Sequence, residues 1–512
     1  MIFKINNTLE DSSISTYKIL IKFILLSFAL VQIVISNFNL YVIFTVFLII
    51  FFTFLTIELF FNKKNLIFYF FPCVLLFSLN FVFLSGPLIF KTIFLQNVND
   101  NLHTPVFTFF IASVYQLTAN LSFLYYKKNK KLINFSKLIA SKIFKPMRSF
   151  DETSIRYMFF IFILVTFNRY YLIFFDRGIN STTDFGDVTV KILYQLSLFY
   201  YLPLILTFKY FFLDRRLNKF IFYSIITFYI VNSFFLSLAG NARSDFYSLF
   251  IILSVLIFFY KFLLSNKFVS FSKVYILFLL IVIISSYSIV SNSILKNRSD
   301  RSVLTPKDLL FKSLDPKQLI MPSIKDYYEG MTYTENELID RLVNIKFLDY
   351  SLKLSNNLSN KDAQQFTEIV IGKYLSIFPQ NFINIFSKNF KKKDYLIATG
   401  SMLEKYNYGS YRGGKLNVGS YLAELKVMLN SYILTFMTVF VFFIFIYILI
   451  QSFQIITDNE IIFSPVIFVI SPNLFFLVAS DTSLDFVYIL IRGAFELVIL
   501  YYILSFFKKK SY

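Results

Sequence analysis

Scarce residue types exclude several kinds of site in this chain of 512 residues. The single cysteine, Cys73, cannot form an internal disulfide or a cysteine metal site. The single histidine, His103, rules out a multi-histidine metal site, and no zinc-ligand spacing occurs. No glycine-rich loop carries the lysine that would hold nucleotide phosphates, so nothing indicates ATP hydrolysis. We therefore expect no metal and no cofactor.

Long apolar runs dominate the sequence. Hydrophobic residues make up 57% of the chain, and the mean hydropathy is +0.64. Runs of about 20 apolar residues match the ~30 Å hydrocarbon core of a bilayer. The sequence predicts an all-α, polytopic transmembrane helical bundle of about 12 spans. The spans are expected at 18–36, 40–60, 66–84, 105–125, 157–175, 192–212, 220–238, 246–264, 274–294, 430–451, 461–480 and 486–507.

Basic residues predict how the bundle is oriented. The net charge is +20, and Lys and Arg concentrate in alternate loops, above all in the basic loop 126–156. Cytoplasmic loops carry such an excess, so both termini are expected to be cytoplasmic. This explains most of the charge without a nucleic-acid partner, and we expect none. No small-residue cleavage site follows the first apolar run, so we expect no cleavable signal peptide.

Three regions follow from this topology. Residues 1–294 hold nine spans, 295–429 form one large external loop, and 430–512 hold the last three spans and a basic cytoplasmic tail. A loop of this length is too long for a connector. Its segments 305–314 and 334–354 carry helix signals, so we expect a mainly helical external loop.

The helix signals in the loop are specific. Thr305 precedes Pro306, the pairing of a cap residue with a proline at the first helical position. Thr334 and Glu337 have the spacing of a capping box. Apolar residues then recur on one helical face, namely Leu338, Leu342, Ile345 and Leu348.

Several arginines break the cytoplasmic bias of the positive charge. They map to the outer half or the outer mouth of the bundle, where a guanidinium group can fork around phosphate oxygens. Structural explanations compete with this one: Arg169 can snorkel to the interface, and Arg492 can pair with Glu496 four residues on. The candidate anion-binding residues are Arg169, Arg177, Arg243, Arg298, Arg301 and Arg492.

Acids and aromatic residues complete the candidate site. The stretch "NYGSYRGGKLNVGS" (407–420) offers Tyr411 and Arg412 for contacts with a carbohydrate, although a flexible loop explains it equally well. Asp245 and Glu424 are our candidates for catalytic acids or bases. The sequence does not choose between them and the other external acids, which are Asp300, Glu335, Glu337, Asp340 and Asp349.

At this level the chain resembles the O-antigen or oligosaccharide repeat-unit polymerases, the Wzy type. The likeness lies in the many spans, the basic inner side and the single long loop late in the chain. Three short motifs add to it: "LAGNARSDF" (238–246), "ELIDRLVNIKFLDY" (337–350) with Arg341 at its centre, and "IRGAFELVIL" (491–500).

The resemblance implies a membrane-embedded, metal-independent glycosyltransferase of the bacterial cytoplasmic (inner) membrane. Its substrate would be an undecaprenyl-pyrophosphate-linked oligosaccharide at the outer face, and its arginines, here Arg243, Arg341 and Arg492, would hold the pyrophosphates. A chain-length regulator is a further expected partner. Two alternatives stay open, namely a repeat-unit flippase and an O-antigen ligase. Such ligases usually need a histidine in the long loop, and 295–429 contains none.

Overall fold

The computed structural model describes most of the chain. The described residues are 2–4, 11–151, 153–174, 188–240, 244–263, 293–294, 297, 300, 304–315, 343–378, 380–386, 390–395, 398–409, 419–457, 460–478 and 482–505. Within them, nine helices are long and apolar enough to cross a membrane. The chain is a multi-pass helical membrane protein.

Apolar side chains without strong periodicity form the candidate spans, because a helix in lipid needs an apolar surface on every side. Three spans are composite: α4–η1–α5, α9–η3–α10 and α24–η7–α25 each run on as one helix. The elements are α1 (Asp11–Ile35), α2 (Leu40–Phe60), α4 (Phe70–Asn80), η1 (Phe81–Ser85), α5 (Gly86–Ile93), α6 (Pro105–Lys128), α8 (Ile155–Phe174), α9 (Val188–Ser197), η3 (Leu198–Tyr201), α10 (Leu202–Phe212), α11 (Lys219–Ala239), α22 (Tyr432–Ser452), α24 (Leu484–Tyr488), η7 (Ile489–Gly493) and α25 (Ala494–Ser505).

The expected spans 246–264 and 461–480 correspond to α12 (Ser244–Leu263) and α23 (Pro465–Val478). The second begins later than predicted, because residues 460–463 form a strand, and it contains Pro472. The expected span 274–294 lies almost wholly outside the described residues. Shorter connecting elements are α3 (Lys63–Phe68), α7 (Lys130–Ile139) and η2 (Ala140–Phe144).

A small sheet departs from the all-α prediction. Strand β1 (Ile2–Lys4) pairs antiparallel with β3 (Glu460–Phe463), and β3 pairs with β2 (Gln454–Ile456). Ile2 lies opposite Ile462, so the start of the chain is fixed beside the loop between α22 and α23. The sequence pattern did not reveal these strands because each has only three or four residues.

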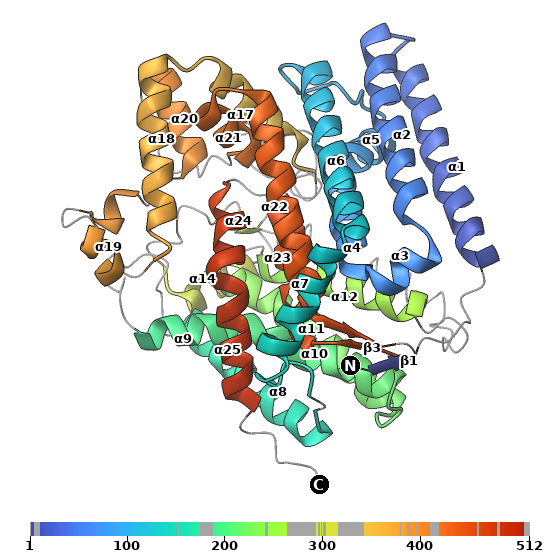
Figure 1. Ribbon diagram of the computed structural model, residues 1–512, viewed down its shortest axis with the longest axis vertical. Coiled ribbons are helices and arrows are strands. Elements are labelled where there is room, and N and C mark those ends of the chain that lie inside the picture. Colours follow the sequence, from blue (N-terminus) through green and yellow to red (C-terminus); the bar gives the residue numbers. More distant parts are fainter. Residues whose placement is uncertain are drawn as a thin grey trace.

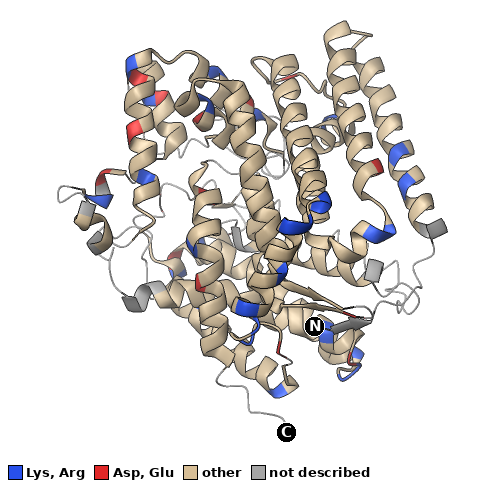
Figure 2. Ribbon diagram, viewed as in Figure 1, with Lys and Arg blue, Asp and Glu red and all other residues tan. Residues whose placement is uncertain are grey.

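The basic loop 126–156 lies on the same side of the molecule as this sheet. The ring of Phe144 in η2 stacks on Phe453 at the end of α22, with ring centroids 4.7 Å apart. Figure 2 shows Lys and Arg residues gathered along α7 and neighbouring helix ends. The predicted topology requires the start of the chain, the loop 126–156 and the loop between α22 and α23 to lie on one face of the bundle, and they do. That this face is cytoplasmic stays a prediction.

At the upper left of Figure 1, opposite the sheet, lies a group of helices that we call the helical cap. It comprises α17 (Ile345–Asn356), α18 (Asn360–Leu375), α20 (Thr399–Tyr408) and α21 (Tyr421–Leu429). Its own apolar core is small and contains Leu354, Phe366, Val370, Met402, Leu403 and Val427. The cap contains both acidic and basic residues (Figure 2). Beside it lie α19 (Gln380–Phe386) and η6 (Lys392–Tyr395).

The helix signals in this region are confirmed in part. α14 (Pro306–Ser313) begins as predicted, and its cap residue Thr305 accepts a hydrogen bond from the Asp308 N–H at 3.1 Å. The second predicted helix should run through Val343 and Asn344 without a break. Instead α17 begins at Ile345, after a turn at Asn344, and Thr334, Glu337 and their neighbours lie outside the described residues.

Candidate functional site

A polar cluster surrounds Arg492 in the span α24–η7–α25. Arg492 lies eight residues beyond Leu484, about 12 Å along the helix at 1.5 Å per residue. Its Nε donates to Glu496 Oε1, and one terminal N–H donates to the backbone carbonyl of Ile377 at 3.0 Å. Gln195 Nε2 and the Tyr488 hydroxyl donate to Glu496 Oε2 at 2.9 and 3.1 Å. We call Arg492, Glu496, Gln195 and Tyr488 the Arg492 cluster.

A local widening of the helix sets the direction of Arg492. The turn η7 is a π-turn, in which the Ala494 N–H bonds to the Ile489 carbonyl five residues back. Such turns often mark functional positions in helices. Gly493 completes the turn, and a side chain there would come within 3.0 Å of the Tyr488 ring. The π-turn and Tyr488 therefore fit together around Arg492.

A second cluster lies where the cap meets the start of the same span. Glu424 of α21 is 1% exposed, and its Oε1 accepts hydrogen bonds from the backbone N–H of Ser483 at 3.2 Å and from the Ser483 hydroxyl. The Tyr374 hydroxyl bonds to the same Ser483 hydroxyl. Lys373 is also buried, and its positive charge acts on the Glu424 carboxyl. These four residues are the Glu424 cluster.

Burial perturbs the protonation of this cluster. Loss of solvent raises the pKa of the Glu424 carboxyl above its ordinary value, although hydrogen bonds from Ser483 and Thr482 and the charge of Lys373 act against the rise. Burial lowers the pKa of Lys373, while the charges of Glu424 and Asp485 oppose the change. A buried carboxyl with a raised pKa can hold a proton nearer neutral pH, which is the property of a general acid or base.

One backbone segment joins the two clusters. Lys373 and Tyr374 at the end of α18 belong to the Glu424 cluster, and Ile377, three residues after Tyr374, binds Arg492. The sequence placed Glu424 and Arg492 in separate regions of the chain. The structure brings them to one junction between the helical cap and the last span.

The described hydrogen bonds of Arg492 involve only some of its N–H donors. A guanidinium group has five N–H donors, and the two bonds described above use two of them. The side chain of Arg492 keeps 38% of its surface exposed, and that of Glu496 keeps 26%. The pairing of Arg492 with Glu496 is therefore confirmed, whereas an anion-binding role for its remaining donors stays a prediction.

Arg169 is the third predicted site residue whose side chain is described. It is half-buried near the end of α8. Its neighbour Asn168 donates to the Leu193 carbonyl at 2.9 Å, two residues before Gln195 of the Arg492 cluster. The described bonds connect the α8 segment to the cluster but do not place Arg169 in it.

The other predicted site residues are not placed. Arg177, Arg243, Arg298, Arg301, Arg341, Tyr411 and Arg412 lie outside the described residues, and Asp245 lies in the first turn of α12 without a described side chain. The segments beside some of these arginines do meet, because Leu238 near the end of α11 packs with Ile294 and with Leu310 of α14. Gly240 follows the last residue of α11, two residues beyond the end of the expected span 220–238.

Two of the other acids have structural partners. Asp349 is fully buried, and its carboxylate accepts the backbone N–H groups of His103 and Thr104 at 2.6 and 2.9 Å. The hydroxyls of Thr104 and Thr108 add bonds at 3.1 and 2.7 Å. Asp349 therefore caps the start of α6, where a negative charge is stabilising, and four donors contact its two oxygens. Asp300 pairs with Lys312 at 2.5 Å.

Sequence reasoning missed several members of the two clusters. Gln195, Tyr488, Ser483 and Lys373 carry no motif, and all but Tyr488, which shares a span with Glu496, come from other segments than their partners. Gln195 alone had a usable signal, because an amide within an apolar span needs a partner.

Comparisons with protein-family models, with curated proteins and with solved structures found no match. A function for this chain therefore rests on its own residues and their arrangement.

Proposed function

We propose that this protein is a membrane-embedded polymerase of lipid-linked oligosaccharide repeat units. It would transfer a glycan from an undecaprenyl-pyrophosphate carrier to the end of another glycan at the outer face of the cytoplasmic membrane. The observation that carries the proposal is Arg492, a half-exposed guanidinium group inside a span and directly beneath the helical cap.

The position of Arg492 suits the carrier. A pyrophosphate attached to a lipid stays near the membrane surface, and its glycan extends into water. Arg492 lies about 12 Å along the span from Leu484 and bonds to Ile377, which follows α18, so it is on the side of the bundle that the cap covers. Because the Glu496 carboxylate holds Nε, the remaining N–H groups keep a fixed direction. Such preorganised charge stabilises a leaving pyrophosphate.

The reaction needs one proton transfer. A hydroxyl oxygen of the acceptor glycan attacks the anomeric carbon of the donor, and the bond from that carbon to the phosphate oxygen breaks. The lipid pyrophosphate leaves with the bonding electrons, and Arg492 neutralises its charge. The hydroxyl proton passes to a base, for which Asp245 at the start of α12 and Glu424 remain the candidates.

Glu424 has a positioning role in the arrangement described. At 1% exposure it touches no solvent, so a substrate hydroxyl could reach it only if Ser483 moved away. While the cluster is closed, Glu424 fixes the first residue before α24 to the cap. It thereby holds the span that bears Arg492.

The test uses purified protein in vesicles with the lipid-pyrophosphate oligosaccharide as substrate. Arg492→Ala is expected to lower polymer formation by about 100-fold or more, since preorganised charge of this kind contributes on that scale. Arg492→Lys keeps the charge but loses the fork, so it should retain only part of the activity.

Arg216→Ala is the matched control, because Arg216 is an exposed arginine on the predicted cytoplasmic side. It should produce polymers of normal length. Normal chain length with Arg492→Ala, in protein that keeps its thermal unfolding profile, would refute the proposal. The remaining arginines, including Arg243 and Arg341, stay predictions for the same assay.

A further inference from the structure

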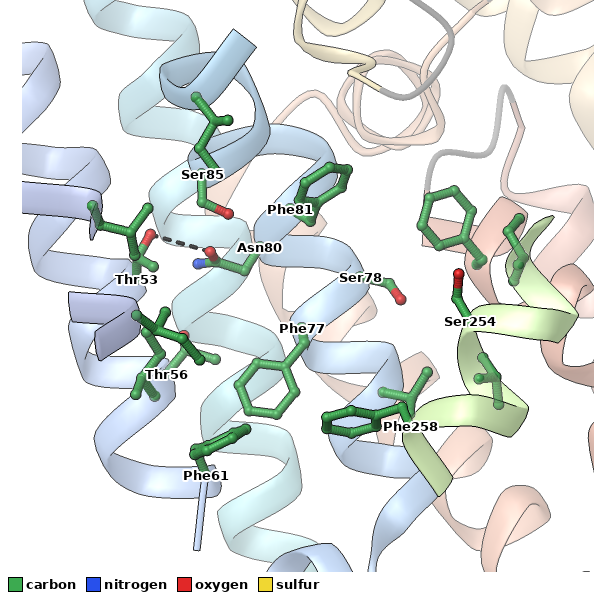
Figure 3. Close-up of a pocket in the computed structure, with 18 of the residues that line it drawn as sticks. Thr53, Thr56, Phe61, Phe77, Ser78, Asn80, Phe81, Ser85, Ser254 and Phe258 are labelled. Atoms are coloured by element: carbon green, nitrogen blue, oxygen red, sulfur yellow. Dashed lines mark hydrogen bonds between the residues drawn. The ribbon is translucent and has the colours of Figure 1, made fainter. Parts of the chain in front are cut away.

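A cavity of about 650 Å³ lies within the membrane-spanning part of the molecule, among α1, α2, α4–η1–α5, α12 and α23. Its walls are mostly Phe, Ile, Leu and Val side chains, and the exceptions are a few hydroxyls and one carboxamide, that of Asn80. Figure 3 shows Phe61, Phe77 and Phe258 around the lower part of the space, and Thr53, Asn80 and Ser85 at one side. None of these residues belongs to the Arg492 or Glu424 clusters.

Asn80 offers a hydrogen bond that nothing described accepts. Its Oδ1 accepts from the Thr53 hydroxyl at 3.1 Å, the dashed line of Figure 3. Its Nδ2 has no hydrogen-bond partner within the described part of the chain, although Asn80 is only 4% exposed. An amide N–H left unpaired in an apolar environment costs of order 1–3 kcal/mol. The position therefore favours an occupant that brings an acceptor.

The polar side chains near Asn80 form hydrogen bonds to other groups and not to its Nδ2. The Thr56 hydroxyl donates to the Phe52 carbonyl at 2.8 Å and accepts from Asn120 Nδ2 at 2.9 Å. Gln116 Nε2 in turn donates to Asn120 Oδ1 at 2.9 Å. This network satisfies the amide of Asn120 between α2 and α6. Asn80, which faces the cavity, takes no part in it.

The backbone holds Asn80 in place. The π-turn η1 follows directly after it, with the Gly86 N–H bonded to the Phe81 carbonyl. A Cβ at position 86 would lie 2.3 Å from that carbonyl oxygen, so only glycine fits. Pro87 then lacks an N–H that would re-form the α-helical bond. The sequence itself therefore favours the π-turn, without the need for a bound molecule. Such turns often occur at functional positions.

Water is a poor occupant for this space. A buried water needs two to four polar partners. One water molecule, whose share of liquid volume is about 30 Å³, would fill only a small part of a cavity of about 650 Å³. Asn80 lies ten residues after Phe70 in the span Phe70–Ile93, about 15 Å along the helix and near the middle of the hydrocarbon core. An occupant at that depth must dissolve in lipid.

We propose that this cavity binds a lipid-soluble molecule that consists of a hydrocarbon chain and a carbonyl oxygen, which accepts the hydrogen bond from Asn80 Nδ2. Its volume lies within the range of small-molecule sites. The aromatic and aliphatic walls contact the chain, and the carboxamide selects for the oxygen. This site is independent of the proposed glycan transfer.

The absence of tryptophan from the sequence gives a direct assay. Phe77→Trp places a single tryptophan in the cavity wall. Two brominated quenchers that differ in the acceptor are titrated into the detergent-solubilised protein: a dibrominated stearate methyl ester and a dibrominated octadecane. We expect saturable quenching by both. The ester should half-saturate at about three- to tenfold lower concentration, the worth of one hydrogen bond.

The same titrations with Asn80→Leu in the Phe77→Trp protein isolate the hydrogen bond. The preference for the ester should vanish there, because the leucine offers no donor. An unchanged preference would overturn the role of Asn80. If Asn80→Leu fails to fold, Asn80→Ala replaces it, and equal affinity of the parent protein for ester and alkane still counts against the proposal.

Phe445→Trp is the control for simple partition of the quenchers into detergent. Phe445 of α22 is 50% exposed on the outer surface of the bundle and lies outside the cavity. Its quenching should rise without saturation and with no effect of Asn80→Leu. Unsaturable quenching of the cavity tryptophan as well would rule out a binding site. No transferase activity enters the measurement, so its failure leaves the proposed function intact.

Discussion

Two spans of this protein contain a π-turn, but the polar side chains at the two turns differ: one is a neutral amide and the other a charged guanidinium group. In α4–η1–α5 and in α24–η7–α25 a π-turn interrupts the helix, and a glycine lies at its end. Beside the first turn, Asn80 is neutral and faces an apolar cavity, and its Nδ2 has no hydrogen-bond partner among the residues that the structure describes. Within the second, Arg492 is charged, paired with Glu496 and bonded to the cap.

The difference shows that a π-turn supplies position but not chemistry. In both spans it sets a polar side chain at a depth where polar groups are costly. What the side chain can bind depends on how its neighbours satisfy it. A neutral amide among phenylalanines suits an uncharged lipid-like molecule, whereas a guanidinium group with a fixed partner suits an anion.

Replacing each glycine by alanine should give the largest difference in stability between the two π-turns. Gly86→Ala brings a Cβ to 2.3 Å from the Phe81 carbonyl oxygen, so the backbone must move, and we expect a loss of about 2–3 kcal/mol in unfolding free energy. Gly493→Ala meets the Tyr488 ring at 3.0 Å, which can rotate, and should cost less than about 1 kcal/mol. Thermal unfolding in detergent measures both. Equal losses would show that the turns are not distinguished in this way.

Loss of the charge of Arg492 at the second turn should have the next largest effect on the unfolding free energy. Arg492→Leu leaves the Glu496 carboxylate without its cation, and we expect a loss of about 1–2 kcal/mol. The expected loss is below that for a fully buried pair because both side chains are partly exposed. The double variant Arg492→Leu, Glu496→Leu should recover most of it. A double variant as unstable as the single one would argue against the ion pair as the cause.

The stability of the protein should depend on pH through Glu424, which binds Ser483 at the start of the span that contains the second turn. Its pKa is raised in the folded protein, so folding favours its protonated form, and this contribution is complete below the ordinary value of 4.5. It disappears as the pH rises through the folded-state pKa. The unfolding temperature of the native protein should therefore fall relative to Glu424→Gln as the pH rises above 4.5. A difference between the two proteins that stays constant with pH would contradict the buried carboxyl.

Asn80→Leu should change stability least. The substitution removes an unpaired amide but also takes the acceptor from the Thr53 hydroxyl, and these effects oppose each other. We expect a net change within about 0.5 kcal/mol in lipid-free protein. A loss as large as that of Arg492→Leu would mean that Asn80 has a structural partner, which would remove the contrast between the turns.

Much of the helical architecture could be predicted from the sequence, because apolar length alone identifies a span. The third span shows where this fails. The span was expected at 66–84, but the π-turn ends at Ser85, Gly86 and Pro87 begin α5, and the helix runs from Phe70 to Ile93. The short strands were missed for a related reason, since β1 pairs only with a segment from the far end of the chain.

The candidate site could be predicted only in its charged members. Arg492 was identifiable because a charge within an apolar span is rare, whereas Glu424 was one of several external acids among which the sequence does not choose. Their partners were not identifiable, since Gln195, Tyr374 and the Ile377 carbonyl reach them only through tertiary packing. Asp349 shows the same limit: the sequence lists it among the external acids but does not reveal that its carboxylate binds the start of α6.

The pairing of β1 with β3 has a consequence for biogenesis. A ribosome releases residues 2–4 long before it makes 460–463, so β1 waits without its partner while nearly all the intervening helices enter the bilayer. The β1–β3 pair can therefore form only late in translation, after residues 460–463 have been made. Truncated or stalled chains would expose this free strand at the membrane surface, where quality-control proteases could find it.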